Sequence, residues 1–177
     1  MNKDEGWINI YKPINISSFQ TLNKIKKKFN LLKIGHAGTL DPLAEGILPV
    51  AIGKTTKLIS FINNDKKEYE FDIKWGEQTS TDDREGQIIS LSTNIPTLTE
   101  IKIELNKHKG KILQKPPQAS AVKINGKRAY SLFRNNKNFT IKKKLVHIYE
   151  ASFIEQVKKE ITKIKIICGK GFYIRSF

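Results

Sequence analysis

Strand-like segments constrain the fold of this chain more than any other feature of its sequence. The stretch KEYEFDIKWG (67–76) alternates apolar and polar residues, which is typical of a half-buried strand. Two longer stretches near the end, TIKKKLVHIYEASFIEQ (140–156) and KEITKIKIICGKGFYIRSF (159–177), also have the composition of strands. The last of these runs to Phe177 without a turn or a cap, so we expect the chain to be cut inside a strand.

Helical segments are fewer and do not alternate regularly with the strands. SSFQTLNKIKKKF (17–29) predicts a helix capped by Ser17, because its apolar residues recur at helical spacing. Other segments predict helices at 55–62 and 97–108 (capped by Thr97 or Thr99), strands at 7–11 and 47–53, a polar loop at 77–87, and a short strand, an Asn-Gly turn and a short helix within 115–134. This order favours an α+β domain with a mixed, largely antiparallel central sheet and flanking helices.

The charge of the chain points to a polyanionic partner. Its 177 residues suffice for one domain with a core, and 32 Lys or Arg against 17 Asp or Glu give a net charge of +15. Residues 105–149 hold twelve of these basic residues and no acidic one. A bias toward Lys, Ile and Asn codons is the alternative explanation, but clustered charge favours a nucleic acid.

Several classes of protein do not fit the sequence. Cys168 is the only cysteine, so no intrachain disulfide forms, and we expect a reducing cytoplasm. The three histidines lie far apart, which predicts no metal site, and no apolar run has the length of a signal core or a membrane span. The stretch AIGKTTK (51–57) resembles the end of a phosphate-binding loop, but Leu48 stands where that motif requires glycine.

The stretch GHAGTLDPLAEG (35–46) is the strongest candidate for chemistry. Asp41 precedes a proline, lies between two leucines and shares a glycine-rich loop with His36. A solvated Asp-Pro turn is the simpler interpretation. A desolvated aspartate could instead act as a nucleophile or a base if a cation such as Arg175 kept it ionised. Tyr69 is either a third member of this group or an ordinary strand aromatic.

Five blocks of the chain, in order, resemble the TruB-type tRNA pseudouridine-55 synthases of the pseudouridine synthase superfamily. They are INIYKPINISSF, GHAGTLDPLAEGILPVAIGKTTK, KEYEFDIKWGEQTSTDDREGQ, KPPQASAVKINGKRAYSLFR and GKGFYIRS. The resemblance implies an α+β catalytic fold with an RNA-binding cleft. It also implies isomerisation of a uridine in the T loop of tRNA, without cofactor or metal.

Carried onto this sequence, the resemblance makes Asp41 the catalytic aspartate, with Arg175 as its ion-pair partner. It makes Tyr69 the aromatic platform for the flipped base and a candidate for a proton-transfer role. His36 takes the place that the extruded base leaves in the RNA stack, and Lys12 and Pro13 support the loop. The expected RNA contacts are His36, Lys12, Lys123, Lys127, Arg128 and Tyr130. Whether Asp41 attacks the ribose C1′ or the base C6 stays open.

The chain departs from the family pattern at three positions and in length. Tyr11 replaces a usual Asp, Asn15 a usual Gly, and Ser80 a usual Asp. Family members continue beyond YIRS, commonly into a small RNA-binding PUA domain, so we expect residues 1–177 to be an incomplete catalytic domain without it. We expect a monomer whose partner is the T arm of tRNA. The alternatives are an inactive RNA-binding fragment, a guide-dependent synthase of the dyskerin type, and a basic ribosome-associated protein.

Overall fold

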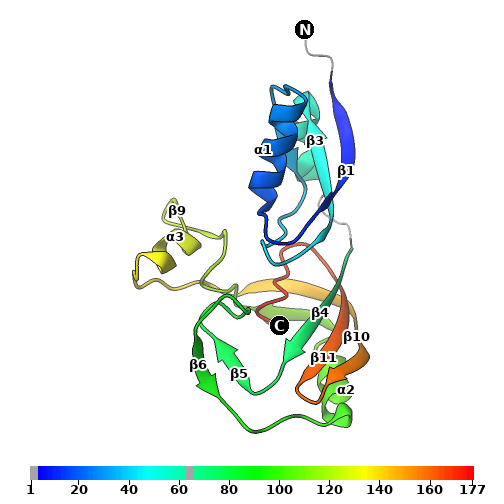
Figure 1. Cartoon of the computed structure of the whole chain (residues 1–177), viewed down its shortest axis with the longest axis vertical. Helices are drawn as coiled ribbons and strands as arrows, with labels where there is room; N and C mark the ends of the chain where they lie inside the picture. Colours follow the sequence, from blue (N-terminus) through cyan, green and yellow to red (C-terminus); the bar gives the residue numbers. More distant parts are fainter. Residues whose placement is uncertain (1–3, 63–65) are drawn as a thin grey trace. The chain divides into compact units, whose positions relative to one another are not determined.

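The computed structural model describes residues 4–62 and 66–177. The chain divides into two compact units, residues 1–63 and 64–177. Figure 1 follows the path of the chain through both units, which are described separately below.

The first unit is a three-stranded sheet with one α-helix (Figure 1). Strand β3 (Gly46–Ile52) lies between β1 (Gly6–Lys12) and β2 (Ile34–His36), and both pairings are antiparallel. Helix α1 (Ser18–Lys28) packs Leu22 against Leu48 and Val50 of β3. The 3₁₀ helix η1 (Gly53–Phe61) follows β3, so the helix predicted at 55–62 is present but has the tighter 3₁₀ form.

Helix α1 begins where the sequence predicts. The Ser17 hydroxyl accepts from the Gln20 N–H at 3.1 Å, and the Gln20 side chain accepts from the Ser17 N–H at 2.9 Å. This reciprocal capping box satisfies two of the four N–H groups that a helix start leaves without partners.

The second unit is built on a four-stranded antiparallel sheet in the order β4-β11-β10-β7. Its strands are β4 (Lys67–Lys74), β11 (Ile161–Cys168), β10 (Lys144–Lys158) and β7 (Gly110–Gln114). Helix α2 (Leu98–Lys107) covers one face and buries Ile101 and Leu105 against Ile164 and Ile166. Thr97, rather than Thr99, caps this helix.

Two short ribbons complete the second unit. Strands β5 (Glu77–Thr79) and β6 (Ile88–Leu91) pair with each other, so the loop predicted at 77–87 is shorter than expected and is held by a ribbon at its base. Strands β8 (Lys123–Ile124) and β9 (Lys127–Arg128) form the predicted Asn-Gly hairpin, which leads into α3 (Ala129–Arg134). In Figure 1, β9 and α3 extend to one side of the sheet.

The prediction of a strand up to Phe177 was wrong. Strand β11 ends at Cys168, and the chain then turns at Gly171, whose φ of 82° is in the left-handed region. The backbone of Tyr173 forms hydrogen bonds with the Gln114 side chain, and Phe177 folds back so that its N–H donates to the Ile174 carbonyl at 3.0 Å. We call this irregular stretch, residues 169–177, the C-terminal segment.

Within the described residues, every paired strand is antiparallel. The predicted α+β class with a largely antiparallel sheet and flanking helices is therefore confirmed, although the strands form separate sheets. The described helices include none that is long and apolar enough to cross a membrane.

Candidate functional site

The Asp41 loop is fixed to the start of α1 by two hydrogen bonds with Ser18. The Ser18 hydroxyl is buried, donates to the Leu40 carbonyl at 2.9 Å, and accepts from the Leu40 N–H at 3.0 Å. On the other side of the aspartate, the Asn15 N–H donates to the Pro42 carbonyl at 2.7 Å. Asp41 itself is half-buried and opens a turn in which its carbonyl accepts from the Ala44 N–H at 3.0 Å. The loop therefore holds the aspartate in a defined orientation.

Lys12 lies under this loop and supports it from inside. Its side chain is fully buried, and the ammonium group donates to the carbonyls of Pro13 at 2.9 Å and Ile16 at 2.8 Å. Burial lowers the pKa of Lys12, while the negative charges of Asp41 and Glu45 act in the opposite direction. This position fits the supporting role that the resemblance implied. Its expected RNA contact stays a prediction, and the structure offers no exposed ammonium group for it.

His36 ends β2, where it lies opposite Val50 of β3. Its Nδ1 atom is buried and has no hydrogen-bond partner within the part of the chain that the structure describes. Burial lowers the pKa of His36, and a hydrogen bond with the Gly38 backbone opposes this shift. The ring is therefore neutral at pH 7, and its insertion into the RNA stack stays a prediction.

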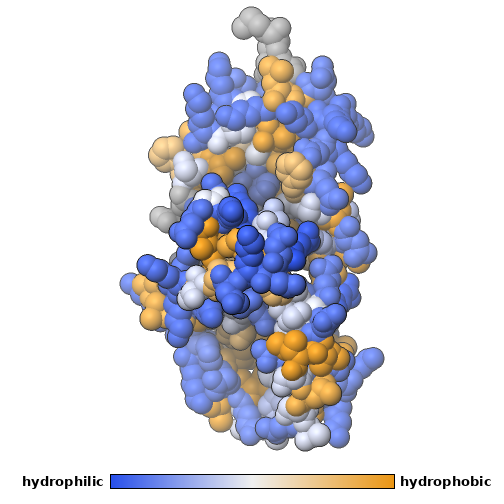
Figure 2. Space-filling view, turned by 90° about the vertical axis from the view of Figure 1, so that its left-hand side faces the viewer, coloured by the Kyte–Doolittle hydropathy of each residue, from blue (hydrophilic) through white to orange (hydrophobic). Residues whose placement is uncertain are grey.

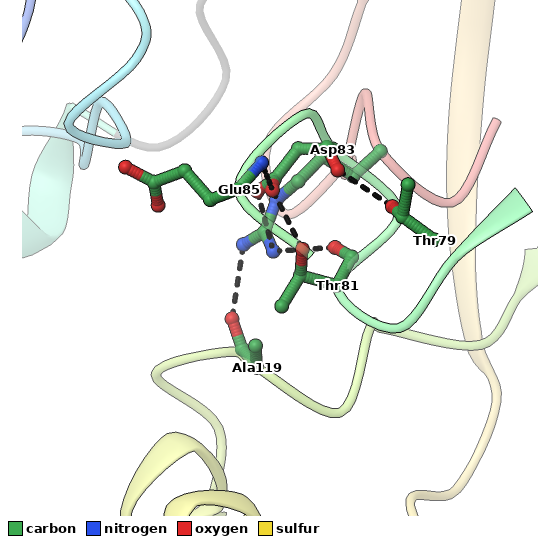
Figure 3. A network of polar contacts seen from close by, with 6 residues as sticks. Thr79, Thr81, Asp83, Glu85 and Ala119 are labelled. Carbon is green, nitrogen blue, oxygen red and sulfur yellow. Dashed lines mark hydrogen bonds and ion pairs between the residues drawn. The ribbon is translucent and has the colours of Figure 1, made fainter. Parts of the chain in front are cut away.

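Arg175 lies in the second unit, where its guanidinium group contacts three residues, Thr81, Asp83 and Ala119, which Figure 3 labels. Two of its nitrogens donate to the carbonyls of Thr81 and Ala119, each at 3.0 Å, and Nη1 lies 3.5 Å from the Asp83 carboxylate. Only 13% of the Arg175 side chain is exposed. A planar guanidinium held at several nitrogens has one preferred orientation, which suits it to present charge to an anion.

The loop around Asp83 is ordered by its own short contacts. The Asp83 carboxylate accepts from the Thr81 hydroxyl at 2.6 Å and from the Glu85 N–H at 3.0 Å (Figure 3). Gly86 closes the loop, and a Cβ atom there would lie 2.7 Å from the Thr81 backbone nitrogen. Burial raises the pKa of the neighbouring Asp82, against the opposing charge of Arg175. Sequence reasoning missed Asp83, although its place in a turn-forming TDDREG stretch was the available signal.

Gln114 fixes the segment that carries Arg175. This side chain is buried at the end of β7, donates to the Tyr173 carbonyl at 2.9 Å and accepts from the Tyr173 N–H at 2.8 Å. Sequence reasoning missed Gln114 as well, because its partner lies 59 positions away.

Tyr69 lies in β4 opposite Ile166, and its ring packs, partly buried, against the core of the second unit. Phe172 and Phe177 of the C-terminal segment pack against the same core.

The arm formed by β8, β9 and α3 carries the remaining predicted RNA contacts. Lys123, Lys127, Arg128 and Tyr130 are all exposed on it. Lys123 lies directly opposite Arg128 in the hairpin, although like charges in that position destabilise a strand pair. One Arg128 nitrogen donates to the Ala121 carbonyl at 2.6 Å, and the Arg134 guanidinium lies 5.9 Å from the centre of the Tyr130 ring. Figure 2 faces the side from which α3 and β9 extend and shows hydrophilic residues gathered there.

The structure thus orders the Asp41 loop in the first unit and the Arg175 guanidinium in the second. Their predicted ion pair would join the two units, and it stays a prediction. Among the described residues, no group of His, Cys, Asp and Glu side chains is arranged to hold a metal ion.

These features match a known family along most of the chain. Residues 26–174 match the TruB family pseudouridylate synthase (N terminal domain). The chain is 46% identical over 173 residues to the tRNA pseudouridine synthase B of Wolbachia pipientis subsp. Culex pipiens, covering 97% of this chain and 49% of that protein. The enzyme of the same name from Bartonella quintana is 46% identical over 171 residues, covering 97% of this chain and 63% of that protein.

Solved structures agree with the sequence relatives. A chain in the crystal structure of a Cbf5-Nop10-Gar1 complex superimposes with a TM-score of 0.69 at 27% identity, covering 97% of this chain and 41% of the other. The fold is that of the pseudouridine synthases. The chain belongs to the TruB family of pseudouridylate synthases and spans about half the length of the curated relatives that it matches.

Proposed function

We propose that this protein isomerises uridine to pseudouridine in tRNA, at position 55 of the T loop. The observation that carries the proposal is the ordered Asp41 loop within a chain 46% identical to tRNA pseudouridine synthase B. The chain shares less with the Cbf5 structure, at 27% identity, which favours action on tRNA over the guide-dependent alternative. We place this activity in the cytoplasm and assign it no metal or cofactor.

The first step in this proposal is extraction of the target base. Removing a base from a folded RNA loop costs a few kcal/mol of stacking. His36 would fill the vacated place, the Tyr69 ring would stack on the flipped uracil, and the basic arm would hold the phosphates. The arm is suited to this because Lys123 and Arg128 lie opposite each other in the hairpin. A phosphate bound between these two positive charges would relieve their mutual repulsion.

The chemical step is assigned to Asp41. Its ionised carboxylate attacks either the ribose C1′, which releases uracil, or C6 of the base. In either route the C1′–N1 bond breaks, the base rotates, C5 bonds to C1′, and the bond to Asp41 is released. C5 then loses its proton and N1 gains one, so that a C–N bond is exchanged for a C–C bond without a redox change. Arg175 would pair with Asp41 and keep it ionised in a site that excludes water. The contacts of Arg175 with Asp83 and with two backbone carbonyls fix the orientation of the guanidinium, which supports this assignment.

Replacement of Asp41 by asparagine tests the proposal. Asp41→Asn keeps the size of the side chain but removes the charge and the nucleophile, so we expect pseudouridine formation to be lost and RNA affinity to stay within about twofold, since binding rests on phosphates and stacking. Pseudouridine in T-arm RNA is measured by mass spectrometry after chemical labelling, and affinity is measured by titration.

Asp72→Asn serves as the matched control, because Asp72 is an exposed residue of β4 that undergoes the same chemical change. Turnover persisting in Asp41→Asn would remove Asp41 from the mechanism. A wild-type chain that binds RNA without forming pseudouridine would instead support the RNA-binding alternative.

A further inference from the structure

The exposed side of α1 carries a group of lysines that the proposed site does not use. Lys24, Lys27 and Lys28 are spaced i, i+3 and i+4, so their side chains are neighbours on the helix surface. All three are exposed, while Leu22 and Thr21 face the sheet. We call this group the α1 lysine face.

The α1 lysine face has no internal counter-charge. The sequence contains no Asp or Glu between Gly6 and Leu40. Within the described residues, the ion pair of the first unit leaves these three lysines out. The Lys28 ammonium group lies 5.7 Å from the centre of the Phe29 ring, which carries no charge. Like charges at this spacing destabilise a helix, and the carbonyl dipoles at the C-terminus favour only the lysines of the last turn, not Lys24.

The position of the face sets its distance from the target base. Ser18, at the start of α1, is bonded to the loop of Asp41. An α-helix rises 1.5 Å per residue, so Lys27 lies about 14 Å along the axis from Ser18. A nucleotide held at Asp41 therefore has its own phosphates near the start of the helix, and Lys27 lies beyond them.

We infer that the α1 lysine face binds the phosphate backbone of a structured RNA at a distance from the target nucleotide. The inference rests on the proposed function, because it requires an RNA at the Asp41 loop. Neighbouring lysines without a counter-charge gain most from a regularly spaced polyanion, which releases counterions when lysines replace them. The RNA body outside the T arm has this chemistry.

The test compares two pairs of substitutions in the full chain. Lys24→Gln with Lys27→Gln removes two charges and keeps helix propensity nearly constant. Lys158→Gln with Lys159→Gln is the matched control, because it removes two exposed lysines from the hairpin between β10 and β11. Circular dichroism checks that α1 is retained. Affinity is measured against salt for unmodified full-length tRNA and for an isolated T-arm stem-loop.

For full-length tRNA, we expect the slope of log affinity against log salt to become shallower by about 2 in the α1 variant and to change much less in the control. Between 50 and 200 mM salt, the variant would then lose about tenfold less affinity than the wild-type chain. Binding of the isolated stem-loop should not change.

An unchanged slope for full-length tRNA overturns the inference, and so does an equal change for the stem-loop, which would place the face on the T arm. Weaker binding of poly-glutamate with an unchanged RNA slope would assign the face to an acidic polypeptide and also overturn it. A chain that shows the expected slopes but forms no pseudouridine contradicts the proposed function and supports this inference.

Discussion

Asn15 departs from the usual residue of the family and adopts a backbone conformation that suits glycine. Glycine is usual at this position in the family that the chain resembles, and here Asn15 has a φ of 62°, in the left-handed region. Asparagine is one of the few residues besides glycine that adopts this conformation routinely. The Asn15 N–H also donates to the Pro42 carbonyl, so Asn15 contacts the Asp41 loop. Tyr11, a second departure, donates to the Glu45 carboxylate at 2.6 Å, a contact that a carboxylate in its place could not make as a donor.

His36 gives the first unit a pH-dependent stability. Burial lowers the pKa of the folded ring below its ordinary value of 6.5, whereas the unfolded ring takes up a proton near that value. The unfolded state therefore binds more protons as pH falls below about 6.5, and stability falls with it, by at most about 1.4 kcal/mol per pH unit until the folded ring also titrates. Above about pH 7.5 the effect is absent.

This prediction is checked by chemical unfolding at pH 7.5 and 5.5, followed by the fluorescence of Trp7 in the first unit. The His36→Gln variant should lose less stability between the two pH values than the wild-type chain. A wild-type chain that gains stability on acidification would contradict the assignment.

At the scale of the element, most strands and helices followed from local pattern. The alternation in β4, the capped helix α1 and the Asn-Gly hairpin were predictable because each depends on neighbours in sequence. The course of the C-terminal segment was not predictable, because Gln114 forms two hydrogen bonds with Tyr173 from 59 positions away. For the same reason, local pattern singled out Asp41 and Arg175 as candidates but did not reveal Ser18 or Asp83, whose roles depend on contacts distant in sequence or hidden within a loop.

Gln114→Leu should loosen the C-terminal segment. The substitution removes the two hydrogen bonds that the Gln114 side chain makes with the N–H and carbonyl of Tyr173 in a part-buried place, which costs about 2 kcal/mol or more of unfolding free energy. Denaturant unfolding followed by Trp75 measures the loss, and amide exchange locates it at residues 169–177. Gln156→Leu is the matched control, because Gln156 is exposed and its bond to the Lys159 carbonyl lies at a hairpin end. Equal effects of the two substitutions would show that the Tyr173 bonds contribute little.

At the scale of the whole molecule, the two units contain separate buried clusters of unequal size. The first unit buries Leu22, Leu48 and Val50 as one cluster, whereas the second buries seven residues together. Each unit also contains one of the two tryptophans, Trp7 in β1 and Trp75 after β4.

We expect thermal unfolding in two steps, with the first unit melting earlier. A difference of 1 kcal/mol between units of this size separates their midpoints by about 4–8 °C. Trp75→Phe leaves Trp7 to report on the first unit, and Trp7→Phe leaves Trp75 to report on the second. Calorimetry of the unsubstituted chain gives the number of transitions. Coincident midpoints from both tryptophans would show a single cooperative unit.

The two hydrogen bonds between Ser18 and Leu40 make the Leu40 amide a reporter of the neighbouring Asp41 loop. The Leu40 N–H is protected by a hydroxyl oxygen and not by a helix or a sheet, so its exchange with deuterium requires only that this side chain move away. Its exchange rate therefore measures how often the loop next to Asp41 opens, while the amides of β3 report the unfolding of the sheet. A nuclear magnetic resonance experiment could follow both in one sample and show whether RNA closes the loop or finds it already closed.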